Sequence, residues 1–108
     1  MSEPIRWVRA AARADLVAGD VVGVVVESLP VALVCAENGS VHALADRCSH
    51  GEARLSDGFV LGDCIECPLH QGQFDVRTGA PLCEPVTEAV ASWPVRVEDD
   101  TVWVGLPG

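Results

Sequence analysis

The chain has 108 residues, of which 49% are hydrophobic, and its formal net charge is −9. This length is sufficient for one domain with a buried core, and the apolar content excludes a disordered chain. Sixteen acidic side chains outnumber seven basic ones, which are all arginines, so the surface repels nucleic acid and anionic membranes. We expect a single domain over residues 1–108. Its acidity either serves solubility alone or steers a basic protein partner.

The chain shows no sign of a membrane span or a secretory signal. Its longest strongly apolar run, residues 21–26, is far shorter than the roughly 20 residues that cross a bilayer. The segment MSEPIRW at the N-terminus lacks the apolar stretch of a signal peptide. These features predict a soluble, cytoplasmic protein.

Short β-branched segments separated by Gly, Pro, Asn and Asp predict an all-β fold. In chain order, the first expected strands are residues 21–29 and 31–37. Asn38-Gly39 then predicts a type I′ hairpin turn, which leads into a strand within 40–46.

Residues 46–58 form the least strand-like region, and a long loop in a compact domain is typically functional. Further short strands are expected within 59–67 and 74–79. Near the C-terminus, valines alternate with charged residues over 95–98, Asp99-Asp100 predicts a turn, and alternation resumes over 102–104. The sum is an antiparallel β-sandwich or small barrel of about seven to ten strands.

Five cysteines require an explanation in a chain of this size. Their odd number, irregular spacing and lack of an export signal argue against a disulfide framework. Clustered cysteines with nearby histidines then indicate a metal site or a redox pair. The sequence Cys64-x-x-Cys67 could be a thiol–disulfide motif, but such motifs usually open a helix and none is expected here.

Two Cys–His pairs stand out. Cys48-x-His50 lies in the long loop, and Cys67-x-x-His70 follows after 16 intervening residues. Each pair comes after an expected strand, so two loops at neighbouring strand ends can bring two thiolates and two imidazoles together.

Two metal sites are compatible with this set of donors. Two Cys and two His can hold one tetrahedral zinc ion, although zinc hooks usually have two to four residues between ligands. In a Rieske [2Fe–2S] cluster, His₂ replaces Cys₂ on one of the two irons. A tight Cys-x-His hook is natural there because its two members bind different irons, so we favour the cluster over zinc.

The motifs CSH, CPLH, GQFDVRTG and APLCEPV resemble those of Rieske ferredoxins from bacterial aromatic-ring-hydroxylating dioxygenase systems of the biphenyl, naphthalene and carbazole type. The resemblance extends from about residue 5 to 106. It implies that Cys48 and Cys67 bind one iron through sulfur, and that His50 and His70 bind the other through nitrogen. It also implies the Rieske fold, with a small cluster-binding subdomain at approximately residues 44–82.

By the same resemblance, the protein is a one-electron carrier in aromatic hydrocarbon catabolism and not itself an enzyme. Its donor would be a flavin-dependent ferredoxin reductase and its acceptor the terminal ring-hydroxylating oxygenase. Independently of the resemblance, a monomer is the default expectation. Three alternatives remain open: the Rieske-like small subunit of an assimilatory nitrite reductase, the ferredoxin of an aromatic monooxygenase, and a structural zinc-binding domain.

Departures from the respiratory Rieske proteins predict a low reduction potential. Those proteins join their cluster loops by a disulfide, at places that Ala53 and Leu69 occupy here. They also place a serine and a tyrosine, which hydrogen-bond to sulfur, where this chain has Gly72 and Phe74. Hydrogen bonds to sulfur stabilise the reduced cluster, so their loss predicts the low end of the Rieske range of about −150 to +300 mV.

The remaining cysteines and the third histidine are expected to have structural roles. Cys35 should be buried in its strand and Cys64 should be a small buried residue. Cys83 should be a packed thiol close to the cluster, and His42 should be structural or exposed.

Overall fold

In a computed structural model, the chain is described over residues 5–48, 53–68, 72–82 and 88–107. Within these ranges it forms ten β-strands, two short 3₁₀ helices and no α-helix. All strand pairs are antiparallel, which confirms the all-β class expected from the sequence.

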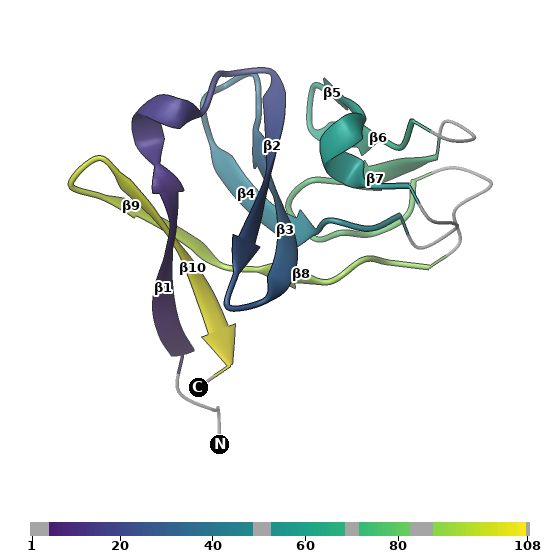
Figure 1. The fold of residues 1–108 in the computed structure, drawn as a ribbon. Coiled ribbons are helices and arrows are strands. Elements are labelled where there is room, and N and C mark those ends of the chain that lie inside the picture. Colours follow the sequence, from purple (N-terminus) through teal and green to yellow (C-terminus); the bar gives the residue numbers. More distant parts are fainter. Residues whose placement is uncertain (1–4, 49–52, 69–71, 83–87, 108) are drawn as a thin grey trace.

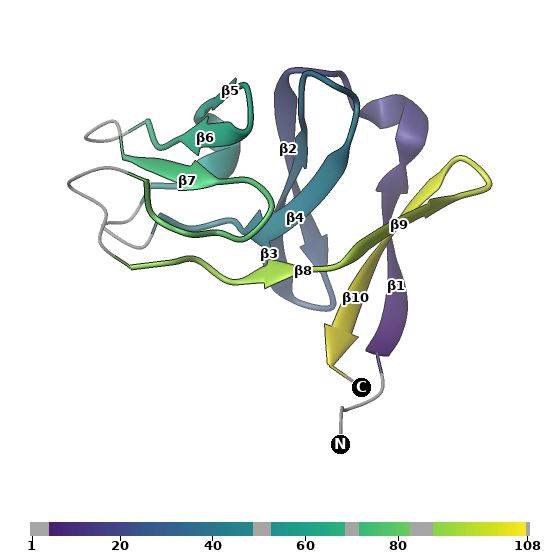
Figure 2. The same ribbon diagram turned by 180° about the vertical axis from the view of Figure 1, so that it is seen from behind.

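The strands form three sheets (Figure 1). The terminal sheet contains, in spatial order, β1 (Ile5–Ala12), β10 (Thr101–Pro107) and β9 (Val95–Glu98). The central sheet contains β2 (Asp20–Val26), β3 (Leu29–Cys35), β4 (Val41–Ala45) and β8 (Ser92–Trp93). The third sheet contains β5 (Phe59–Leu61), β6 (Cys64–Glu66) and β7 (Gln73–Asp75). The 3₁₀ helices are η1 (Arg13–Asp15) and η2 (Leu55–Asp57). The chain runs from β8 directly into β9 and so links the central and terminal sheets (Figure 2).

The central sheet is covered on both faces, and β3 shows this most clearly. Val31, Leu33 and Cys35 pack in one core, whereas Ala32 and Val34 pack in the other. All five side chains are buried. A strand buried on both faces is apolar at every position, which is why this segment is continuously hydrophobic and does not alternate.

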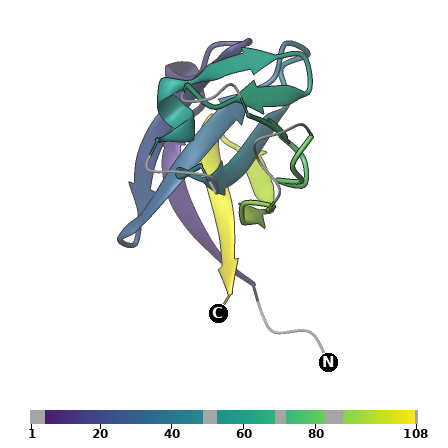
Figure 3. The same cartoon turned by 90° about the vertical axis from the view of Figure 1, so that its right-hand side faces the viewer.

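Each core belongs to a different neighbour of the central sheet. The first core is shared with the terminal sheet and includes Val102, Val104 and Leu106 of β10. The second is shared with the β5–β7 sheet and includes Ile65 and Phe74. Figure 3 views the molecule from the side of the β5–β7 sheet, with the central sheet behind it and β1 and β10 farther back.

The turn after β3 differs from the expected type I′ turn. Gly39 has φ +90°, but Asn38 does not adopt a positive φ, which a type I′ turn requires at both central residues. Instead, the Gly39 amide donates to the Ala36 carbonyl at 2.8 Å. The Asn38 side-chain oxygen accepts the Ser40 amide at 2.9 Å, an Asx-type contact made from an ordinary backbone conformation. The type I′ prediction is therefore wrong. The Ala36 amide donates to the Ser40 carbonyl at 2.8 Å, so this hairpin has a three-residue loop.

Two other hairpins do have both central residues at positive φ. Glu27 and Ser28 join β2 to β3 with φ 49° and 73°, and Asp99 and Asp100 join β9 to β10 with φ 52° and 61°. The predicted turn at Asp99-Asp100 is confirmed, and its two-residue length with both φ positive makes it type I′.

The first strand was not expected from the sequence. Strand β1 reads IRWVRAAA, a pattern without clean period-two alternation, and its pairing shifts register between Arg9 and Ala11. A bulge of this kind displaces the alternation of side chains, so the strand is recognised only through its partner β10.

Candidate metal centre

The first cysteine loop begins where β4 ends. Cys48 is 2% exposed, and its amide donates to the Ala53 carbonyl at 2.9 Å. The loop then enters η2, whose Leu55 is buried in the same core as Cys48. The thiol of Cys48 is thus held at the start of a closed loop and faces the interior.

The second cysteine loop connects β6 to β7. Cys67 is 1% exposed, and its amide donates to the Gly72 carbonyl at 2.7 Å. At the base of this loop, the Gln73 side-chain amide donates to the Glu66 carboxylate at 3.1 Å across the strand pair.

The two loops share one design. In each, the cysteine amide donates to the carbonyl of the fifth residue after it, and the cysteine side chain is buried. Both cysteines lie in the single core between the central sheet and the β5–β7 sheet. The structure therefore brings together Cys48 and Cys67, which are 19 positions apart in the sequence.

The predicted histidine ligands His50 and His70 lie outside the described residues, so their role stays a prediction. Among the residues that the structure describes, no three His, Cys, Asp or Glu side chains form a group that could hold a metal ion. Leu69 and Cys83 also lie outside the described part of the chain.

The two described donors fit an iron–sulfur cluster. Both side chains are buried in one core with apolar side chains such as Leu55, Ile65 and Phe74. Thiolates are soft ligands that bind iron in clusters, and an apolar, water-poor shell is one of the features by which a protein tunes such a site.

The other two described cysteines, Cys35 and Cys64, were both expected to be buried, and only Cys35 is. Cys35 is fully buried in β3, which confirms its expected structural place. Cys64 on β6 is only partly buried, because the next residue, Ile65, is buried in the core and successive side chains of a strand point to opposite faces.

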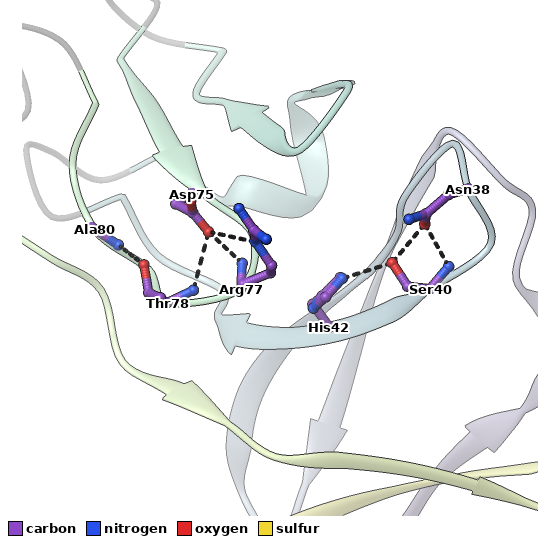
Figure 4. A network of polar contacts seen from close by, with 7 residues as sticks. All are labelled: Asn38, Ser40, His42, Asp75, Arg77, Thr78 and Ala80. Atoms are coloured by element: carbon purple, nitrogen blue, oxygen red, sulfur yellow. Dashed lines mark hydrogen bonds and ion pairs between the residues drawn. The ribbon is translucent and has the colours of Figure 1, made fainter.

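His42 on β4 is partly buried and takes part in a polar network (Figure 4). Its ring Nε2 lies 2.9 Å from the Ser40 hydroxyl. Burial lowers the pKa of His42 below its ordinary value of 6.5, and the nearby Arg77 guanidinium lowers it further. Asp63 and Asp75 oppose this shift. His42 therefore has a structural place and favours its neutral form.

The sequence analysis missed the side chains that close the base of the first loop, Asp46 and Ser56. Both Ser56 donors reach the Asp46 carboxylate at 2.7 Å. Ten positions separate the two residues, so only the folded loop shows that they meet. The one available signal was an acidic residue directly after a strand and two positions before a candidate ligand.

A family model described as "Rieske [2Fe-2S] domain" matches residues 6–94. The chain belongs to the Rieske [2Fe–2S] family. It carries one [2Fe–2S] cluster. No helix among the described residues of this Rieske protein has the length and apolarity needed to cross a membrane.

Several relatives of this Rieske chain are ferredoxins, and two of the three described next are named with a dioxygenase system. It is 47% identical over 102 residues to the ferredoxin component of the naphthalene 1,2-dioxygenase system from Pseudomonas putida, covering 94% of this chain and 97% of that one. The solved structure of the Sphingomonas yanoikuyae B1 ferredoxin has a TM-score of 0.88 at 34% identity, covering 94% and 100% of the two chains. A ferredoxin solved in complex with the reduced oxygenase of carbazole 1,9a-dioxygenase has a TM-score of 0.82 at 36% identity, covering 91% of both chains.

Proposed function

We propose that this protein is a one-electron carrier that takes electrons from a flavin-dependent ferredoxin reductase and delivers them to the terminal oxygenase of an aromatic-ring dioxygenase. When bound, a [2Fe–2S] cluster accepts and releases one electron at a time. The observation that carries the proposal is the pair of matching loops, each with a buried cysteine in one core.

In this proposal, Cys48 and Cys67 hold one iron through sulfur, while His50 and His70 hold the other through imidazole nitrogen. The apolar core around the two thiols excludes water from the sulfur side. The imidazole edges of the two histidines would then face the partner protein.

The relatives support the partners proposed here. The related ferredoxins are named as components of dioxygenase systems, and one of them was solved together with its oxygenase. The net charge of −9 favours a partner with a basic docking surface, approached through salt-sensitive steering. We also propose that the protein acts as a monomer in the cytoplasm, where its cysteines stay reduced.

Ligand substitutions test the site. We expect Cys48→Ser, Cys67→Ser, His50→Ala and His70→Ala each to abolish or alter the visible absorption and the EPR spectrum of the reduced protein. Cys64→Ser and His42→Gln are matched controls, because they replace the same residue types outside the proposed ligand set. An unchanged spectrum in any of the four ligand variants would contradict its assignment.

Electron delivery is tested by mixing. The protein, reduced anaerobically, should be re-oxidised rapidly by a ring-hydroxylating oxygenase of the naphthalene or carbazole dioxygenase type, and the rate should fall as salt is added. Rapid re-oxidation by a nitrite reductase or by a di-iron monooxygenase instead would favour the nitrite reductase subunit or the monooxygenase ferredoxin as the function. Both functions have less support than that of a dioxygenase ferredoxin, because the curated relatives are named as ferredoxin components of dioxygenase systems.

A further inference from the structure

Asp46 is the one charged side chain that is buried in the described part of the chain, at 8% exposure. Its two carboxylate oxygens accept from different donors of one residue. The Ser56 amide donates to Oδ1 and the Ser56 hydroxyl donates to Oδ2, each at 2.7 Å. The carboxylate thus joins the first residue after β4 to the 3₁₀ helix η2, across the base of the first cysteine loop.

Two further strands meet at this contact. The Asp46 amide donates to the Pro30 carbonyl of β3 at 3.1 Å. Gly23 of β2 lies against the other side, where a Cβ atom would be 2.8 Å from Ser56 Oγ and 2.9 Å from Asp46 Oδ2. Gly23 has no positive φ, so this position uses glycine for space and not for backbone conformation.

The charge of Asp46 has no stabilising ion pair among the described residues. Burying an unpaired carboxylate costs free energy, whereas an apolar side chain in the same space would leave both Ser56 donors without this acceptor. What the carboxylate adds is two strong acceptors that reach both donors of Ser56 at once. The arrangement is therefore suited to holding two chain segments together.

We propose that Asp46 is a positioning residue that holds the base of the first cysteine loop closed, so that Cys48, two residues later, stays in place to bind the cluster. This inference rests on the proposed role of Cys48 as a ligand. The second loop has a weaker counterpart, the partly exposed Glu66–Gln73 contact of 3.1 Å at its base.

The test measures cluster release. The intact, cluster-loaded protein is mixed with an iron chelator, and loss of the visible absorption is followed over time for Asp46→Ala, Asp46→Asn and the wild type. Val104→Ala is the control, since Val104 is buried in the other core and its truncation lowers overall stability without touching the loop. If the Tm of Val104→Ala differs from that of Asp46→Ala, Val102→Ala is used as the control, because Val102 lies in the same core as Val104.

We expect Asp46→Ala to release iron about tenfold faster than a control of equal Tm, because the loop opens locally when both hydrogen bonds are lost. Asp46→Asn should behave nearly as the wild type, since its amide oxygen can accept the Ser56 amide and its NH₂ can donate to the Ser56 hydroxyl. Equal release from Asp46→Ala and the control, or release from Asp46→Asn as fast as from Asp46→Ala, would overturn the proposal.

Two more readouts do not depend on Asp46→Ala being well folded. Gly23→Ala places a Cβ atom too close to Asp46 and Ser56, so it should also speed iron release. Val25→Ala changes a side chain on the same strand that is 72% exposed, and it should not speed release. Exchange of the Ser56 amide hydrogen should rise in Gly23→Ala and stay slow in Asp46→Asn. If iron release and Ser56 amide exchange both stay at the wild-type level in Gly23→Ala, the proposed role of the Asp46–Ser56 contact is contradicted.

Failure of the ligand assignment is distinguishable from failure of this inference. If Cys48 is not a ligand, Cys48→Ser keeps the wild-type spectrum. If only the positioning role is wrong, Cys48→Ser loses the spectrum while Asp46→Ala matches its stability control.

Discussion

Phe74 lies fully buried in the core that also contains Cys48 and Cys67. It has no hydroxyl with which to donate a hydrogen bond to sulfur. Such bonds stabilise the reduced, more negative form of a cluster, so we expect a phenylalanine at this position to lower the reduction potential.

We predict that Phe74→Tyr raises the reduction potential, because its hydroxyl can donate to sulfur in this core. Voltammetry of the two proteins measures the difference. Phe59→Tyr makes the same change at a side chain 59% exposed on β5, and should leave the potential unchanged. An equal or lower potential in Phe74→Tyr, or a wild-type value above about +100 mV within the Rieske range, would contradict the low-potential interpretation.

His42 makes stability depend on pH. Its pKa in the folded protein is lowered, first by burial and then by Arg77, against the opposing effect of Asp63 and Asp75. Below its ordinary pKa of 6.5, the unfolded chain binds a proton that the folded chain resists. The contribution of His42 to stability is therefore fully present above 6.5 and falls as the pH decreases through the window below it.

We predict that His42→Gln flattens this part of the pH profile. Urea unfolding of both proteins at pH values above and below 6.5 measures the free energy of unfolding, and the wild type should lose more on acidification than the variant. Arg77→Gln should reduce the slope in part, since it removes the second cause of the shift. Identical slopes in wild type and His42→Gln would show that other groups, including the cluster loops, dominate the profile.

At the scale of elements, the hairpin turns differ in how well their residues suit the backbone. Asp99 and Asp100 both adopt positive φ, a conformation that is costly for residues with a side chain. Gly39, in the hairpin after β3, adopts φ +90° at no such cost. The chain therefore uses glycine in one turn that needs positive φ and aspartate in another.

We predict that Asp100→Gly raises the free energy of unfolding by about 0.5–1 kcal/mol, because relief of the strained conformation exceeds the added entropy of the unfolded chain. By contrast, we predict that Gly39→Ala lowers the free energy of unfolding by about 1 kcal/mol. A new Cβ there would meet no atom within 4 Å, so the backbone conformation alone causes the loss. Thermal or urea unfolding measures both, and a destabilised Asp100→Gly would be the contrary result.

The elements also show which parts of the fold could be predicted from sequence. Strand β3 and the hairpin at Asp99-Asp100 were predictable because apolar runs and turn residues are local signals. Strand β1 was not, because its bulge disturbs the alternation and its pairing partner β10 lies at the other end of the chain. The Asn38-Gly39 turn was assigned the wrong type because Asn38 uses its side chain in place of a positive φ.

At the scale of the whole molecule, the central sheet separates two cores with different roles. One joins it to the terminal sheet and contains neither candidate ligand cysteine, whereas the other contains Cys48 and Cys67. The sheet that covers the second core is smaller than the terminal sheet, because its strands β5, β6 and β7 have only three residues each. We expect it to depend more strongly on the cluster for its stability.

We predict that removal of the cluster raises amide hydrogen exchange in residues 53–82 while β1, β3 and β10 keep their protection. Hydrogen exchange of the cluster-free and cluster-loaded protein measures this difference. The result would support the expectation that residues 44–82 form a cluster-binding subdomain. Equal loss of protection in all three sheets would show instead that the chain behaves as one cooperative unit.

The sequence by itself determined the all-β class, the two Cys–His pairs and the family, because β-branched runs, turn residues and ligand spacing are local patterns. Only the tertiary structure placed Cys48 and Cys67 in one core, gave the central sheet two covered faces and joined Asp46 to Ser56. Those contacts join residues distant in the sequence, and hydrogen bonds and packing of that kind depend on where the sheets bring the chain together.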